Sequence, residues 1–431
     1  MVYRVSLERV VSRLKELENP VVVSHIDADG LTSGGIMLKT LREMGKPTEI
    51  IPIRQLDQTT YDDIPWDREL VFVDLGSGQI EWTKDHVVID HHQPVKETPY
   101  QFNAHYLGME GSREISASGL AYLISKELIG HSNLAGPAVV GMMGDRVTVP
   151  LSGYARVPLE TPWVKAMKGL KYFGRETRSL PVFLEYASDP FIPGLSSELG
   201  SCYNFIRNLK LDEKKTYHQL TKKEREILTN SLVKYASKRR VRVHHMLGEY
   251  YILPEMPAGV EMRDASEFST LLNACGRHDR PEVGIGLVIG EDVYKDAKHL
   301  LRIHRRLLSR GINELRVKGT EKFKNFQLFR GDTIKPTLVG IVAGIAISAR
   351  IVDHNKPMIA LTHEEGGYKI SGRGTLELVE RGLNIGHAMT QASKGFGEGG
   401  GHDVAAGAFV EAGKIKEFLR RLDLIFGRQL K

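Results

Sequence analysis

Cysteine is scarce in this chain, since its 431 residues include only two, Cys202 and Cys275. The two lie far apart in the sequence, which is the spacing of neither a disulfide framework nor a thiolate metal site. We therefore expect both thiols to be reduced and packed in the interior.

Long hydrophobic runs are also missing. No stretch approaches the roughly 20 apolar residues that cross a bilayer, and the segment Met1–Glu8 lacks the apolar core of a signal peptide. The Gly-Lys-Ser and Gly-Lys-Thr sequences of the P-loop are absent too, which argues against nucleotide hydrolysis of that kind. These absences predict a cytoplasmic protein without a membrane partner.

What the chain does contain is typical of a soluble globular protein, with 41% hydrophobic and 26% charged residues. Its length exceeds what one hydrophobic core usually supports, which favours two domains. The net charge of +6 favours a polyanionic partner, because lysine and arginine side chains that neutralise phosphates release bound counterions. Composition alone is equally compatible with a protein that binds no nucleic acid.

Strand-like and helix-like patterns alternate along the N-terminal part, which predicts an α/β fold with a mostly parallel sheet and crossover helices. A second α/β pattern follows, with strand-like runs at 250–253, 283–289 and 358–361. The charged stretch between the two patterns is expected to form an amphipathic connecting helix. We predict an N-terminal domain at 1–195, a helical connector at 196–245 and a smaller C-terminal α/β domain at 246–431.

Three hydrophobic strands in the N-terminal part each run into acidic or histidine side chains. The first leads to His25, Asp27 and Asp29, the second to Asp74, and the third to Asp90, His91 and His92. Ligands of open α/β sheets bind outside the carboxyl ends of the strands, so these side chains are placed to converge on one crevice. A further acid, Asp145, follows an apolar helix-like run and is either a surface turn residue or a group that reaches the same crevice.

Clustered carboxylates are costly unless cations neutralise them, and bound divalent metal is the obvious remedy. Carboxylates with imidazoles and no thiolate suit Mn²⁺ or Mg²⁺, and imidazole favours Mn²⁺. Two ions roughly 3.5 to 4 Å apart lower the pKa of a shared water and clamp an in-line displacement at phosphorus. Asp74, on the middle segment, is the natural bridging ligand. The alternative, in which each acid is an isolated loop residue or helix cap, requires three coincidences at strand ends.

Glycine is concentrated near the C-terminus, in Ser371–Gly374 and Gly395–His402. Consecutive glycines let backbone amides approach a phosphate closely, and Arg373 and His402 can add charge and hydrogen bonds. A flexible surface turn explains the same glycines equally well. The stretch also matches the GxGxxG dinucleotide-binding pattern, but it follows a helix-like run rather than a strand and precedes no phosphate-binding helix.

Together these segments resemble the DHH phosphoesterase superfamily with a C-terminal DHHA1 domain, and most of all the short archaeal RecJ-like nucleases. The resemblance covers nearly the whole chain. It rests on four N-terminal motifs and one C-terminal signature, which are His25–Gly30, Val73–Gly76, Asp90–His92, Gly144–Asp145, and Gly399–His402 with Ala405–Gly407.

The resemblance implies two Mn²⁺ ions, with Mg²⁺ as an alternative, in an active site in the cleft between the two domains. The metal ligands that it implies are Asp27, Asp29, Asp74, His91 and Asp145, with His25 as a further ligand. Several small-molecule members place the first histidine four positions before the first aspartate, whereas His25 lies two positions before Asp27. The role of His25 therefore stays open.

The resemblance also implies roles around the ions. Asp90 would orient His91, and His92 would lie near the scissile phosphate as an acid or hydrogen-bond donor. The catalytic residues would then be Asp74, Asp90 and His92. The substrate phosphates would be bound by Arg373, Gly399, Gly400, Gly401 and His402.

The function expected from these residues is that of a metal-dependent exonuclease that degrades single-stranded DNA, or also RNA, to nucleoside 5′-monophosphates in repair or replication. Its expected partners are single-stranded nucleic acid, a repair helicase or replication-complex subunit, and a second copy of the chain. One alternative is a phosphoesterase that acts on short oligoribonucleotides, 3′-phosphoadenosine phosphate or cyclic dinucleotides. Another is a replication or repair scaffold whose nuclease site has decayed, although the complete set of acids argues against decay.

Overall fold

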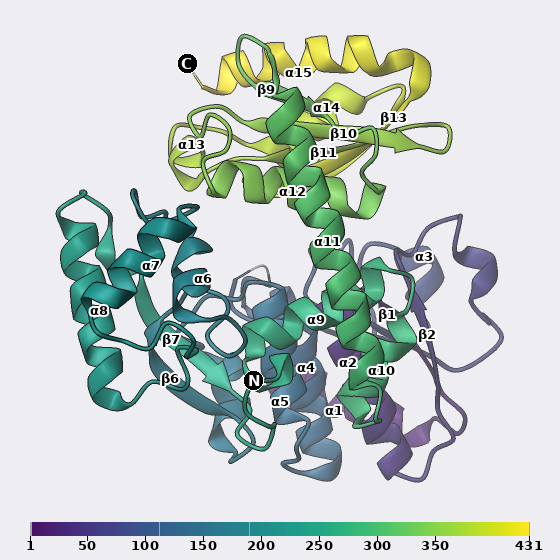
Figure 1. Cartoon of the computed structure of the whole chain (residues 1–431). Coiled ribbons are helices and arrows are strands. Elements are labelled where there is room, and N and C mark those ends of the chain that lie inside the picture. Colours follow the sequence, from purple (N-terminus) through teal and green to yellow (C-terminus); the bar gives the residue numbers. More distant parts are fainter. Residues whose placement is uncertain (1, 112, 189, 431) are drawn as a thin grey trace. The chain divides into compact units, whose positions relative to one another are not determined.

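The computed structural model describes residues 2–111, 113–188 and 190–430, which divide into two compact units. The first unit contains the residues up to Leu184 together with Gly200–Leu301. The second contains Glu185–Leu199 together with the residues from Arg302 onward. Figure 1 labels many of the helices and strands of both. Within the described ranges, no helix is long and apolar enough to cross a membrane.

A five-stranded parallel sheet forms the centre of the first unit, which confirms the expected fold class. Its strands lie in the order β2 (Glu49–Ile53), β1 (Val21–His25), β3 (Leu70–Val73), β4 (Val87–Asp90) and β5 (Gln101–Asn103). Because all five run the same way, their carboxyl ends lie along one edge. The order reverses between β1 and β3, and ligands of such sheets bind at this switch point.

Both faces of the parallel sheet are covered. Helices α1 (Val2–Glu16), α2 (Ala28–Glu43) and α4 (Ala117–Ile129) pack on one face. Side chains alternate along each strand, so Val71 joins the core on the side of these helices, whereas Phe72 joins a smaller core with Trp66 and Trp82. This burial on both faces explains why the strand sequences are continuous apolar runs.

Helix α2 begins immediately after β1, because Asp27 caps it by accepting a 3.0 Å hydrogen bond from the amide of Gly30. The helix is then buried along most of its length. Its neighbours besides α4 are α5 (Ala135–Gly144), α9 (Ala265–Arg277) and α10 (Pro281–Ile289). The N-terminal end of α2 is therefore fixed from several sides, next to the carboxyl end of β1.

The strand predicted at 283–289 is wrong, because this stretch forms most of α10. Proline is well suited to the first turn of a helix, and Pro281 begins α10. Gly290 ends the helix in a left-handed conformation with φ of 93°. A short apolar run that is buried against neighbours looks the same in a strand and in a helix, so hydrophobicity alone misassigned it.

The remainder of the first unit joins a two-stranded antiparallel sheet to short helices. The strands are β6 (Lys165–Leu170) and β7 (Leu247–Ile252). The helices are α3 (Ile80–Thr83), α6 (Leu180–Glu185), α7 (Leu199–Asn208) and α8 (Lys222–Ser237), the last two lying in the predicted connector. Thr221 and Glu224 form a capping box at the start of α8.

A six-stranded mixed sheet forms the second unit, as expected for a C-terminal α/β domain. Its order is β12 (Gly397–Gly401), β13 (Ala405–Glu411), β11 (Gly367–Arg373), β10 (Met358–Glu364), β9 (Gln327–Arg330) and β8 (Glu321–Lys322). Strands β9 and β10 pair in parallel, and the other neighbours pair antiparallel.

Helices pack on both faces of this mixed sheet. They are the part of α11 (Tyr294–Lys318) from Arg302 onward, α12 (Pro336–Ser348), α13 (Leu376–Glu380), α14 (Ile385–Ser393) and α15 (Ile415–Gln429). The first turns of α11 belong to the first unit. Met358 and Ala360 of β10 pack with α12, whereas Ile359 and Leu361 pack with α14 and α15. The alternation along β10 thus places α12 opposite α14 and α15.

Candidate metal centre

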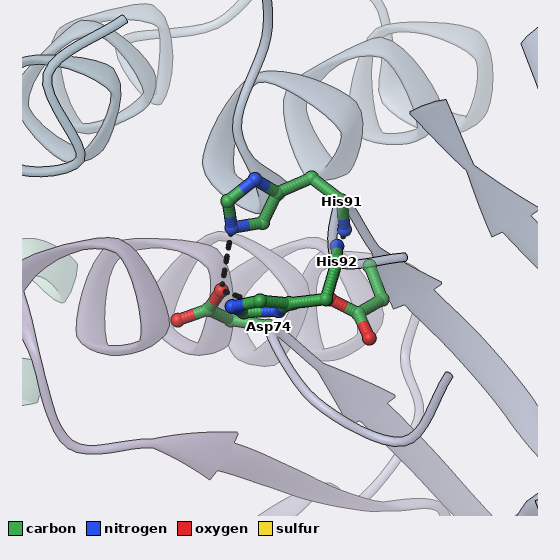
Figure 2. A group of neighbouring side chains, drawn as sticks. Asp74, His91 and His92 are labelled. Atoms are coloured by element: carbon green, nitrogen blue, oxygen red, sulfur yellow. Dashed lines mark hydrogen bonds and ion pairs between the residues drawn. The ribbon is translucent and has the colours of Figure 1, made fainter. Parts of the chain in front are cut away.

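The carboxyl ends of β1, β3 and β4 bring acidic and histidine side chains together, as the three strand ends predicted. His25 is the last residue of β1, Asp74 follows β3, and His91 follows β4. The Nδ1 atom of His25 lies 3.3 Å from Oδ2 of Asp74. The Nε2 atom of His91 lies 3.2 Å from Oδ1 of the same carboxylate (Figure 2). Asp74 therefore lies between two imidazoles that come from different strands.

The backbone at Asp74 is unusual, since its φ of 61° lies in the left-handed region. Non-glycine residues rarely adopt this conformation, although aspartate and asparagine tolerate it best. The amide of Asp74 donates a 3.0 Å hydrogen bond to the carbonyl of Ile89, which ties the turn to β4. Strained residues of this kind concentrate at functional sites, and here the strain places the carboxylate between the strands.

Among the residues that the structure describes, two groups of side chains have ligand atoms close enough together to hold an ion. One consists of His25, Asp27 and Asp74, and the other of Asp74, Asp90, His91 and His92. Asp74 belongs to both groups, which is the arrangement that a carboxylate shared by two ions requires.

Asp29 is held in a different way from the other acids. Its carboxylate is buried and accepts hydrogen bonds from the Ser116 hydroxyl at 2.5 Å and from the amides of Ala117 and Ser118 at 2.8 and 3.1 Å. Its Oδ2 atom lies 3.9 Å from Nε2 of His91, at the edge of the cluster. The first turn of α4 therefore fixes Asp29, and the sequence did not reveal this anchor.

Asp145 lies beside the cluster. It caps the C-terminal end of α5, and its Oδ2 atom lies 3.5 Å from Nδ1 of His91. Asp145 therefore lies in a turn, with 29% of its side chain exposed, and its carboxylate still faces His91. Asp145 comes from the end of a helix, whereas the other acids of the cluster were predicted from the ends of strands.

The structure assigns Asp90 a contact that differs from the expected one. Its Oδ1 atom accepts a 2.8 Å hydrogen bond from Nδ1 of the His92 ring. From His91 it accepts a hydrogen bond from the backbone amide and none from the ring. The ring of His91 is held instead by the carbonyl of Gly111, 2.7 Å from Nδ1. A carbonyl can only accept, so this bond places the Nδ1 proton and leaves Nε2 to face Asp74 as a ligand atom.

Three groups that influence this site through hydrogen bonds or charge were not predicted from the sequence. Besides Gly111, Asn273 of α9 accepts a 3.2 Å hydrogen bond from the amide of Ala28, between Asp27 and Asp29. Arg277 of α9 has a pKa that burial lowers, while the nearby Asp27 opposes the shift. Neither α9 residue belongs to a local motif, so only the tertiary contacts reveal them.

The electrostatics of the cluster indicate missing positive charge. Burial and the charge of Asp74 raise the pKa of Asp29 to about 6. Burial, together with Asp29 and Asp74, raises the pKa of Asp145 to about 8. Burial opposes protonation of His92, but the hydrogen bond and charge of Asp90 raise its pKa to about 9. The site thus takes up protons to offset its carboxylates, and divalent cations held by the same oxygen and imidazole atoms would replace those protons. These residues fit Mn²⁺ or Mg²⁺.

The predicted substrate-binding residues of the second unit also lie together. Arg373 ends β11, Ala405 begins β13 beside it, and His402 follows the end of β12. The amide of His402 donates a 2.9 Å hydrogen bond to the carbonyl of Ala405, which closes the turn between β12 and β13. Arg373 and His402 therefore share one end of three adjacent strands.

The glycines before His402 do not form the expected loop, because residues 397–401 form strand β12. A Cβ atom on Gly399 would lie 2.7 Å from the carbonyl oxygen of Met389 in α14. Gly401 has φ of 133°, and a Cβ atom there would lie 2.6 Å from Cα of Ala406. Glycine at these two positions allows a strand to pack closely on a helix and its neighbour. Gly400 differs, since the nearest atom to its added Cβ is 3.9 Å away.

Comparisons with known proteins now identify the family. A model of the DHH family N-terminal domain matches residues 19–142, a DHH-CID domain model matches 172–247, and a DHHA1 domain model matches 331–428. The uncharacterized protein MJ0831 of Methanocaldococcus jannaschii is 34% identical over 430 residues, which cover 95% of this chain and 94% of that protein. This chain belongs to the DHH family. The DHH-CID match contains the whole of 196–245, the stretch that was expected to be a helical connector.

Solved structures share the fold of this DHH protein. RecJ from Thermus thermophilus in complex with Mn²⁺ has a TM-score of 0.61 and 17% identity over 98% of this chain, which spans 55% of that RecJ. A second exonuclease RecJ bound to manganese has a TM-score of 0.60 and 17% identity, with 98% and 94% of the two chains covered. CDC45 from Entamoeba histolytica has a TM-score of 0.64 and 12% identity, with 99% and 98% covered. The fold is RecJ-like.

Proposed function

We propose that this DHH protein is a metal-dependent exonuclease that hydrolyses terminal phosphodiesters of single-stranded DNA, and also of RNA, to nucleoside 5′-monophosphates. One observation carries the proposal, which is the membership of Asp74 in both ligand groups. A shared carboxylate suits two Mn²⁺ ions, with Mg²⁺ as the alternative. When bound, such ions activate a water and stabilise the charge that develops on the reacting phosphate.

We assign metal binding and proton donation to the side chains around Asp74. His25 and Asp27 would complete one ligand group, and His91 would bind through Nε2 because Gly111 holds its Nδ1 proton. Asp29 and Asp145, at the edge of the cluster, would be further metal ligands. We assign the proton that the leaving oxygen needs to Nε2 of His92, because Nδ1 of that ring is bonded to Asp90.

Three features favour a polymeric substrate. The net charge is +6, and α11 presents the exposed residues Arg302, Arg306 and Arg310. Two of the solved structures with this fold are of RecJ with manganese bound. We further propose that Arg373 and His402, with Gly399, Gly400 and Gly401, bind phosphates of the strand. A repair helicase, a replication-complex subunit or a second copy of the chain are the proposed protein partners.

The test uses single-stranded oligonucleotides that carry a label at either end, incubated with Mn²⁺. The variant is Asp74→Asn, because asparagine tolerates the left-handed backbone while it removes the shared charge. Asp62→Asn is the matched control, since Asp62 is exposed and belongs to neither ligand group. Wild type and the control should shorten the strand stepwise from one end, and Asp74→Asn should be inert.

The same reactions separate the alternatives. 3′-Phosphoadenosine phosphate is included as a competing substrate, and its consumption without any shortening of the strand would favour a small-nucleotide phosphoesterase. Binding of the strand without cleavage in Mn²⁺ or Mg²⁺ would favour a scaffold. Equal cleavage by wild type and Asp74→Asn would refute the assignment of the metal centre.

A further inference from the structure

Arg373 lies between strand β11 and helix α12 within the second unit. It is the last residue of β11 and is half-buried. Its Nη1 atom donates a 2.7 Å hydrogen bond to the carbonyl of Gly372, so one side of the guanidinium is held by its own strand. The other side faces α12, where Gly340 is buried.

Gly340 leaves space that the guanidinium occupies. A Cβ atom built on Gly340 would lie 2.7 Å from Nη2 of Arg373 and 2.9 Å from Oγ of Ser371. Both are closer than a methyl group tolerates, and both belong to side chains that can rotate. Cβ of Ser371 lies 3.2 Å away and is fixed to β11, so it must give by a few tenths of an ångström. An alanine at this position would therefore displace mainly the guanidinium, which is the far end of a flexible side chain.

The backbone does not explain the glycine. Gly340 lies inside α12, whose regular helical conformation suits alanine better than glycine. Glycine at this position leaves room for the Arg373 guanidinium, because it has no side chain. Gly344, one turn further along the same helix, provides a comparison, because a Cβ atom there would lie 3.8 Å from Nε of Arg373, an ordinary van der Waals distance.

We propose that Gly340 is a positioning residue, which holds the Arg373 guanidinium in the orientation that binds a substrate phosphate. An arginine binds phosphate through donors in a rigid planar fork, so its value depends on the direction of that plane. The carbonyl of Gly372 and the bare helix backbone at Gly340 confine the fork from two sides. The inference rests on the proposed function, since it concerns the residue assigned there to phosphate binding.

The experiment compares Gly340→Ala with Gly344→Ala in the full chain with Mn²⁺. We measure kcat and KM for a single-stranded oligonucleotide, its binding by fluorescence anisotropy, and thermal unfolding. Gly340→Ala should raise KM and the dissociation constant by about tenfold, the scale of one charge-assisted hydrogen bond. Its kcat and melting temperature should stay close to those of the wild type, and Gly344→Ala should match the wild type throughout.

Arg373→Ala provides the decisive background. If Gly340 acts through the guanidinium, adding Gly340→Ala to Arg373→Ala changes neither KM nor binding further. The inference is overturned if Gly340→Ala weakens binding and raises KM as strongly in the Arg373→Ala background as in the wild type. It is also overturned if Gly340→Ala alone leaves KM and binding at wild-type values. If the wild type binds the strand but does not cleave it, the proposed activity is refuted. The dissociation constants then still test whether Gly340 positions Arg373. A wild type that neither binds nor cleaves the strand overturns both.

Discussion

The Oδ1 atom of Asp74 lies 3.2 Å from Nε2 of His91, although the two residues come from the ends of different strands. The left-handed backbone of Asp74 and the hydrogen bond between His91 and Gly111 hold this pair from opposite sides. Ligand atoms that are held in place before a cation arrives need little rearrangement to bind it. Cation binding should therefore add directly to the stability of the folded state.

The first prediction concerns the stability that Mn²⁺ adds. Asp29 and Asp145 have pKa values raised to about 6 and about 8, and His92 has one raised to about 9. The metal-free folded state therefore binds more protons than the unfolded chain above the ordinary aspartate pKa, so these groups make stability fall as the pH rises toward 9. Mn²⁺ replaces the protons, so its stabilisation should be larger at pH 8.5 than at pH 6.

Thermal unfolding with and without Mn²⁺ at the two pH values checks this prediction. A free ion concentration of 100 times the dissociation constant adds about 2.7 kcal/mol. Asp74→Asn should lose most of the increment, and Asp62→Asn should keep it. An increment that is equal at both pH values would contradict the proton–metal exchange.

The second prediction concerns Asp90→Asn. Burial lowers the pKa of His92, but the hydrogen bond and charge of Asp90 outweigh it and raise this pKa to about 9. Without the charge, His92 should lose its proton at lower pH, so the activity at pH 8 should fall more than the activity at pH 6. Loss of a supporting hydrogen-bond partner of this kind typically lowers activity by about 10–100-fold.

Two measurements check the role of Asp90. The pH profile of kcat should lose its alkaline side first, and NMR titration of the metal-free protein should show a lower pKa for His92. A uniform loss at all pH values, with an unchanged His92 titration, would instead indicate that Asp90 acts only on the backbone.

The third prediction separates two neighbouring glycines of β12. Gly399→Ala places a methyl group 2.7 Å from the backbone oxygen of Met389, which cannot move independently, so it should destabilise the second unit by about 1–3 kcal/mol. Gly400→Ala meets its nearest atom at 3.9 Å and should change stability by less than about 0.5 kcal/mol. Chemical denaturation of the two variants checks the difference. Equal losses would show that β12 does not pack as described.

The fourth prediction concerns a buried ion pair that supports α9. Arg175 and Asp264 are both buried and form two hydrogen bonds of 2.7 and 2.9 Å, and Asp264 also caps α9. Arg175→Ala leaves the carboxylate buried without its partner and should cost about 3–5 kcal/mol. Denaturant unfolding measures this loss. Arg207→Ala is the control, because Arg207 pairs with Glu213 on the surface and its removal should leave stability unchanged.

The sequence alone determined the parallel sheet and the place of its site. Apolar strands such as Val21–His25 and Leu70–Val73 carry their own signal, because burial on both faces requires continuous hydrophobic residues. Parallel strands must end along one edge, so the acids that follow them had to meet. The motifs around Asp27, Asp74 and His91 were therefore predictable from local pattern.

The tertiary structure decided everything that depends on contacts between distant residues. The partner of Ala28 is Asn273, 245 positions away, and the ring of His91 is oriented by a backbone carbonyl that has no sequence signature. Asp145 joins the cluster because α5 packs against α2, α4 and α9. The glycines of β12 form a strand because they pair with β13, and α14 packs closely against Gly399. Local sequence records which side chains are available, whereas packing selects which of them meet.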